Sequence, residues 1–256
     1  MINLIRMDLY RINKNRAFWT CLILAMASAF IQTPLAWLLY RVGSMFSDEI
    51  SAFPEKAMLS EIIADPFPLL NATLAMISAC SFFYADVENG YIKNIAGQMP
   101  MRGYTVLSKF VAVIPHNIVF MLAALICNLI GTILFQKIDV DAGVLNQIGM
   151  FFLKLLLFQS LCAILLLVTS TLRSKSLGSV LSVLLGTGIL FLAYMAIESG
   201  IEQLFNLENF SISKYMPDQL LRDASPKPLT AILSALVTGA VFLILAVRIF
   251  DRRDVK

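Results

Sequence analysis

His116 is the only histidine in the 256-residue sequence, so a multi-histidine metal centre and an HExxH zinc site are both excluded. The sequence also contains neither a GxSxG nucleophile elbow nor a GxxxxGK[ST] phosphate-binding loop. His116 follows Pro115 near the start of a long apolar run, where polar neighbours can satisfy the backbone groups that a proline leaves unpaired. We therefore expect His116 to have a packing role, and we expect the chain not to be an enzyme and to bind neither ATP nor a metal ion itself.

Lys154 and four cysteines are the other reactive side chains within apolar runs. Cys21, Cys80, Cys127 and Cys162 occur singly, without a CxxC pair, which favours small buried hydrophobic residues over a disulfide or a metal site. Lys154 lies within an apolar run, and an intramembrane charge suggests a function. Near the end of a span, however, a lysine stem can reach the lipid headgroups. We expect Lys154 to reach the headgroups in this way, with a substrate contact or an ion pair as the alternative.

Residues 86–109 form a polar segment between two apolar runs that are each long enough to cross a membrane. Acids, a glycine- and proline-containing break and bases follow one another here: Asp86, Glu88, Gly97, Pro100, Arg102, Gly103 and Lys109. A loop that only joined two spans could be a handful of residues. The pattern therefore predicts a short helix on the membrane surface that docks a soluble partner. A solvated connector whose charges mark the bilayer edge is the alternative.

The composition predicts an all-α polytopic membrane protein, because 59% of the residues are hydrophobic and only 14% are charged. A net charge of +3 gives no indication of nucleic-acid binding. Neither a repeat nor a linker divides the chain, so we expect one domain over residues 1–256. Six apolar segments approach the roughly 20 residues that a span requires: 17–40, 67–85, 110–135, 148–172, 177–197 and 229–250.

The flanking segments set the expected topology. Residues 1–16 have the pattern of an amphipathic helix that lies in the membrane interface. With the N-terminus in the cytosol, the cytosolic segments carry thirteen Lys and Arg residues and the outer segments six, which predicts that both termini are cytosolic. The outer segments 41–66 and 198–228 combine short apolar clusters with acids and prolines. They predict short amphipathic or re-entrant pieces at the outer mouth, or else ordinary surface loops.

Two of the predicted spans have unusual polarity or residue size. The second carries Asn71 and Ser78 among its polar residues, so we expect neighbouring helices or a cavity around it rather than lipid. The fifth carries Gly178, Ser182 and Gly186 at intervals of four residues, which lets another backbone approach closely. This face can be a contact within one monomer or a contact between two monomers.

In these features the chain resembles the permease subunits of bacterial type-2 ABC exporters, particularly those of the bacitracin-resistance and lantibiotic-immunity kind. The resemblance covers nearly the whole chain. It rests on the six spans, the basic amphipathic start LIRMDLYRINKNRAFW, the first cytosolic loop with Glu88, Gly90, Arg102 and Lys109, and the closing FDRRDV.

The resemblance implies an ATP-driven exporter subunit in the bacterial cytoplasmic membrane that binds no cofactor directly, since a separate cytosolic ATPase uses the ATP. Residues 88–99 would be the coupling helix that docks on this ATPase. The residues expected in ATPase coupling are Asp86, Glu88, Gly90, Tyr91, Arg102 and Lys109. Those expected in the translocation path or at a dimer face are Asn71, Ser78, Gly178, Ser182 and Gly186.

The resemblance leaves open whether the substrate is a peptide, an antibiotic or a lipid, and whether the second permease is a copy of this chain or a paralogue. A stand-alone membrane sensor or assembly factor, which would use the same loop to bind another cytosolic protein, is the alternative function. A carrier driven by protons or sodium ions is disfavoured, because no ionisable residue is predicted near the bilayer midplane.

Overall fold

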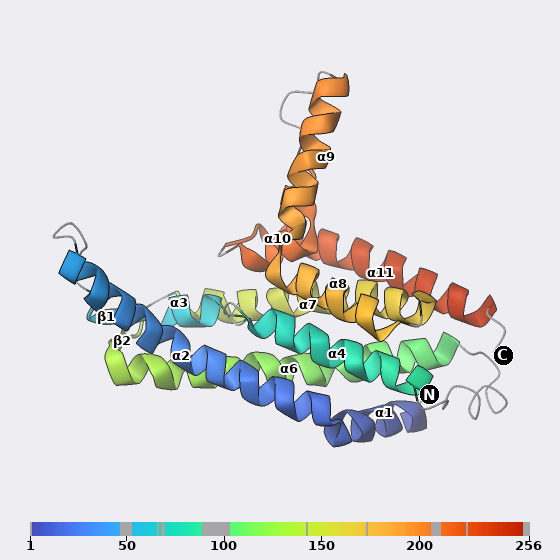
Figure 1. The fold of residues 1–256 in the computed structure, drawn as a ribbon, viewed down its shortest axis with the longest axis horizontal. Coiled ribbons are helices and arrows are strands. Elements are labelled where there is room, and N and C mark those ends of the chain that lie inside the picture. The colour runs from blue at the N-terminus through green and yellow to red at the C-terminus, as the bar shows by residue number, and fades with distance from the viewer. Residues whose placement is uncertain are drawn as a thin grey trace.

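The computed structural model describes residues 2–46, 53–65, 67, 70–88, 103–141, 143–172, 174–205, 211–223 and 225–252. Long helices run side by side and form an elongated bundle (Figure 1). The elements are α1 (Ile2–Lys14), α2 (Arg16–Phe46), β1 (Lys56–Met58), α3 (Leu59–Ala64), α4 (Asn71–Glu88), α6 (Gly103–Phe135), β2 (Lys137–Asp139), α7 (Val144–Leu172), α8 (Lys175–Thr187), α9 (Leu190–Phe205), the 3-10 turn η1 (Ser213–Tyr215), α10 (Pro217–Arg222) and α11 (Pro228–Arg252).

Four of the described helices, α2, α6, α7 and α11, are long and apolar enough to cross a membrane, and α8 with α9 makes a fifth if this bent pair is one span. The expectation of an all-α membrane protein is therefore confirmed at this level. Helix α1 is a separate amphipathic helix, and it lies beside the ends of α4 and α6 (Figure 1). The last turn of α11 lies at the same end of the bundle as α1 (Figure 1).

Helix α4 is the second predicted span and lies inside the bundle. It packs against α2, α6, α7 and α8, and no described side chain between residues 71 and 86 is exposed. The expectation that neighbouring helices surround this segment is confirmed. By composition alone, α4 is not among the helices apolar enough to span. Asn71 at its start and two acids in its last turn lower its hydropathy, and the surrounding helices make a lipid-facing apolar surface unnecessary.

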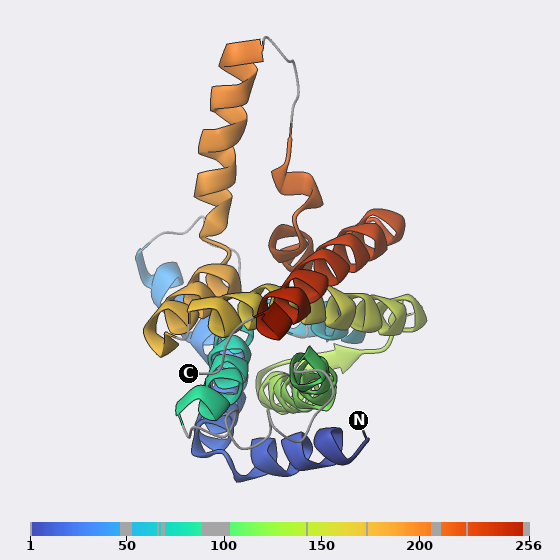
Figure 2. The same cartoon turned by 90° about the vertical axis from the view of Figure 1, so that its right-hand side faces the viewer.

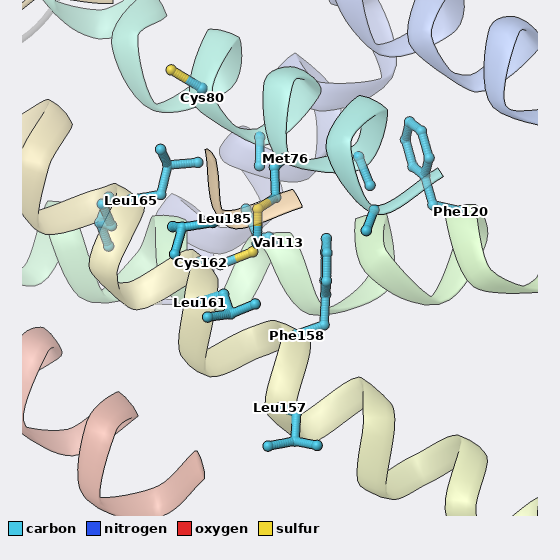
Figure 3. Close-up of a cluster of buried hydrophobic side chains, with 14 of the residues drawn as sticks. Met76, Cys80, Val113, Phe120, Leu157, Phe158, Leu161, Cys162, Leu165 and Leu185 are labelled. Atoms are coloured by element: carbon cyan, nitrogen blue, oxygen red, sulfur yellow. The ribbon is translucent and has the colours of Figure 1, made fainter. Parts of the chain in front are cut away.

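The core lies where α4, α6, α7 and α8 meet (Figure 3). Large side chains such as Met76, Phe120 and Phe158 are fully buried there. All four cysteines are buried and free, as the sequence predicted.

The fifth predicted span, 177–197, is not one straight helix. It is divided into α8 and α9, whose axes differ by 77°. Gly188 lies at the break with φ +69°, in the left-handed conformation that commonly ends a helix and that glycine adopts most easily. Helix α9 consequently projects away from the bundle (Figure 2). An apolar composition gives no information about this backbone reversal, and the prediction that residues 177–197 form one span stays a prediction.

The described parts of segments 41–66 and 198–228 contain small elements, whereas their position at an outer mouth stays a prediction. Strand β1 pairs in parallel with β2, with Lys56 opposite Lys137, and the Lys56 ammonium lies 2.8 Å from an oxygen of Asp139. Helix α3 then packs on α7, and α10 packs on α7 and α11. Neither strand was predicted.

Candidate coupling site at the end of α4

Asp86, in the last turn of α4, is the centre of a buried ionic cluster. The Lys109 ammonium of α6 lies 2.8 Å from Asp86 Oδ2 and also donates to the Phe83 carbonyl oxygen at 2.8 Å. The Arg11 guanidinium of α1 contacts the other carboxylate oxygen of Asp86. Asp86 is 2% exposed and Lys109 is 6% exposed, so solvent screens this pair weakly. The carboxylate therefore ties α4 to both α1 and α6.

A second carboxylate extends the cluster along α1. Asp8 is buried, its Oδ2 accepts a hydrogen bond of 2.5 Å from Ser108 Oγ, and its Oδ1 lies 3.6 Å from Arg11 Nη1. Burial raises the pKa of the Asp8 carboxyl, while the Ser108 hydrogen bond and the Lys109 charge oppose this shift. Helix α1 thus contributes an acid and a base to the cluster, and its position is fixed by polar contacts as well as by its apolar face.

The start of α6 is held separately by α11. The Gly103 amide donates to Asp251 Oδ1 at 2.5 Å, which places a carboxylate at the N-terminus of α6, where it complements the positive end of the helix dipole. A Cβ atom at Gly103 would lie 2.7 Å from Val247 Cγ1 and 2.9 Å from Asp251 Oδ2, so a larger residue would displace these side chains. The segment between α4 and α6 therefore has both of its ends anchored in the bundle.

The structure brings together two of the residues expected in ATPase coupling, Asp86 and Lys109, but as a buried pair. Glu88 differs, because its side chain is 58% exposed and lies 3.6 Å from that of Lys175 at the start of α8. Gly90, Tyr91 and Arg102 lie outside the described residues, as does most of the expected coupling helix 88–99. Within the described part of the chain, Glu88 is thus the expected coupling residue that remains accessible.

Sequence reasoning missed the contribution of α1. Asp8, Arg11 and Ser108 were not singled out, although Asp8 is an acid in an otherwise basic amphipathic segment. A carboxylate three residues before an arginine on one helix is a common surface pair. The sequence contained no signal that both side chains would point towards α4 and α6.

The small-residue face of α8 packs on α4 of the same chain. Gly178, Ser182 and Gly186 are buried, and Ser182 Oγ lies 3.3 Å from the Met76 carbonyl oxygen. At Gly186 an added Cβ atom would lie 2.5 Å from the Cα atom of Thr73. The geometry therefore supports the first of the two readings, a contact between helices of one monomer.

Replacing Gly186 with alanine should destabilise the folded chain by about 1–3 kcal/mol, because the α4 and α8 backbones would have to separate. The matched control is Gly149→Ala on α7, where an added Cβ atom meets no atom within 4 Å. That change should be neutral or should stabilise α7 by up to about 1 kcal/mol through helix propensity. Thermal unfolding of both purified variants in the same detergent compares them. Equal stabilities would contradict the close packing of α4 on α8.

The other two residues expected in the translocation path serve polar packing inside the bundle. Ser78 Oγ lies 3.0 Å from His116 Nε2, and His116 Nδ1 lies 2.9 Å from Asn117 Oδ1. His116 is therefore buried with a side-chain partner at each ring nitrogen, as expected of a residue with a packing role. Asn71 accepts a hydrogen bond of 2.9 Å from Ser28, and its amide nitrogen is buried without a partner among the described residues. A translocation role for Asn71 and Ser78 stays a prediction.

The prediction that Lys154 reaches the headgroups is wrong. Lys154 is 3% exposed, and its ammonium donates to the Ala64 carbonyl oxygen at 2.7 Å. The physical reason is the position of α3, which folds over α7 and presents the carbonyl of its last residue to the lysine. A helix C-terminus is a favourable place for a cation.

No protein-family model matches the chain, and no curated protein matches it.

Proposed function

We propose that the chain is the permease subunit of an ATP-driven exporter, that it has six spans, and that a separate cytosolic ATPase acts on it through residues 86–109. The observation that carries this proposal is the ionic cluster at Asp86. It fixes the last turn of α4, which leads directly into the polar segment, to α1 and α6. A force applied to the segment is therefore transmitted to the helix at the centre of the bundle.

The packing of α4 on α8 supports a substrate path along the second and fifth spans, which correspond to α4 and to the pair α8–α9. The two helices pack closely at Gly178, against the Cys80 side chain, and at Gly186, against the Thr73 backbone, so a displacement of one helix would press on the other. Glu88, at the end of α4, also faces Lys175, the first residue of α8. A partner protein that binds beside Glu88 would therefore act on the ends of both helices.

The six spans of this proposal are the four long apolar helices, α4, and the pair α8–α9. Since α4 is surrounded by protein, its polar residues are compatible with a transmembrane position. The apolar side chains of α9 support the participation of a second permease, because an apolar surface on all sides of a helix calls for lipid or protein cover. Those exposed on or beside α9 are Ile189, Phe191, Leu192, Met195 and Ile197.

The proposal requires the polar segment to be cytosolic, and cysteine labelling tests this. Single cysteines at Ser176 and Ser225, both exposed, are introduced into a chain that lacks its four native cysteines. In intact cells a membrane-impermeant thiol reagent should label the cysteine at position 225. It should label the one at position 176 only after the membrane is opened. The reverse pattern would place residues 86–109 outside the cell and would refute docking of a cytosolic ATPase.

A further inference from the structure

A cavity of about 560 Å³ lies where the two outer segments meet the bundle. Helix α3 and the residues after it form one side, and α10 with the end of α8 forms another. The volume lies within the range of about 300–1,000 Å³ that is typical of small-molecule sites. Its lining combines four charged side chains, the polar Thr187 and several apolar side chains: Glu61, Asp65, Lys154 and Arg222, then Ala64, Phe67, Leu70, Ala72 and Leu221.

Lys154 is the buried cation of this cavity. Its ammonium has three N–H groups, and the described residues accept one hydrogen bond from it, through Ala64. None of the described carboxylates forms an ion pair with it, although Asp65 and Asp223 attract it from a greater distance. A buried charge is costly unless it is paired and hydrogen-bonded. Lys154 therefore favours an anionic group within the cavity.

Arg222 places a second cation on the cavity wall. Its guanidinium donates to the carbonyl oxygen of Gly186, in the last turn of α8, where carbonyl groups lack partners within the helix. Burial lowers the pKa of Arg222, and the charges of Asp218 and Asp65 oppose this shift. A guanidinium has five N–H groups, so further donors remain for an anion.

The acids and the apolar residues specify the rest of the ligand. Glu61 and Asp65 are exposed, so they lie nearer to solvent than the buried ammonium of Lys154. Two bases and two acids balance one another, which matches a ligand that carries one negative and one positive group. Phe67, Leu70 and Leu221 provide an apolar wall, and Leu70 is itself 48% exposed, so the cavity opens beside an apolar surface.

We propose that this cavity binds the head of a zwitterionic lipid that carries a phosphate and a primary amine. The phosphate pairs with Lys154 and Arg222, the amine with Glu61 and Asp65, and the acyl chains leave along the apolar wall. The site goes beyond the proposed export function and does not depend on it, since binding requires no ATPase.

The test measures binding to the purified full chain by native mass spectrometry. The probes share the same short acyl chains: phosphatidylethanolamine, phosphatidylglycerol and diacylglycerol. Phosphatidylethanolamine should bind about tenfold more tightly than phosphatidylglycerol and about a hundredfold more tightly than diacylglycerol, since hydrogen bonds to charged groups have effects of this size. Lys154→Met should weaken the binding of both phospholipids about tenfold. Glu61→Gln should weaken phosphatidylethanolamine alone.

The control is Lys214→Met, which removes an exposed lysine from a different cavity and should leave all three affinities unchanged. If Lys154→Met does not fold, Lys154→Arg and Glu61→Gln are measured instead. The arginine variant should still bind both phospholipids, and Glu61→Gln should weaken phosphatidylethanolamine alone. Three results would overturn the proposal. They are equal binding of phospholipids and diacylglycerol, a preference for phosphatidylglycerol, and equally effective competition by glycerophosphoethanolamine, which would indicate a soluble ligand.

Discussion

Replacing Asp86 with alanine should destabilise the folded chain by about 3–5 kcal/mol, because Lys109 would remain buried without the carboxylate that forms its ion pair. The Arg11 guanidinium loses the same partner, so α1 should be held less firmly beside the end of α4. Thermal unfolding of the purified variant measures the loss of stability. Limited proteolysis near residue 15, between α1 and α2, measures the release of α1.

Two further variants separate the ionic cluster from general effects of charge. Glu88→Gln removes an acid from an exposed pair two residues away and should cost no more than about 1 kcal/mol. Adding Lys109→Met to Asp86→Ala should restore part of the stability, because the uncompensated ammonium is then absent. If Asp86→Ala and Glu88→Gln had equal and small effects, the cluster would not hold α4 in place.

Replacing residues 89–102 with a glycine–serine linker of the same length should abolish export. Such a linker is a flexible coil and presents neither a helix nor charges to a docking partner. Asp86, Lys109 and Gly103 lie outside the exchanged segment, so the anchors at its two ends remain. The chain should therefore insert and unfold as the unmodified protein does.

The readout for this replacement is ATP-dependent export together with thermal unfolding of the same variant. Loss of export with unchanged stability is the expected result. A control exchanges residues 53–55, which precede β1 at the other end of the bundle (Figure 1), for glycine and serine and should retain export. If export persisted without the native segment, residues 86–109 would not be the route by which ATP hydrolysis acts.

The sequence was sufficient to predict the membrane class and the position of α4, for identifiable reasons. Long apolar runs require a nonpolar environment, and the polar residues of the second run required protein neighbours, which the burial of residues 71–86 confirms. Composition could not predict the break at Gly188. Gly186 and Gly188 lie two residues apart in an apolar run, and such a pair is as compatible with close helix packing as with a left-handed turn. The contacts from Arg222 and Gln219 that hold the break lie more than thirty residues further along the chain.

The ionic cluster at Asp86 was also predictable only in part, because its contacts join residues that lie far apart in the sequence. Asp86 and Lys109 drew attention as charges at the borders of apolar runs, and the structure pairs them. The pair also contacts Arg11 of α1, and a sequence pattern does not report which face of α1 meets which helix. Lys154 was misread because its partner, the Ala64 carbonyl oxygen, is a backbone atom of a short helix that composition did not define.

Co-purification tests the central claim most directly. The full-length chain, tagged and solubilised from its native membrane under mild conditions, should carry with it a P-loop ATPase in stoichiometric amount. The linker variant of residues 89–102 should carry none. An ATPase that accompanies both forms equally would contradict docking at this segment. A different cytosolic protein bound through the segment, with no ATPase in either preparation, would contradict the exporter and favour the sensor or assembly factor.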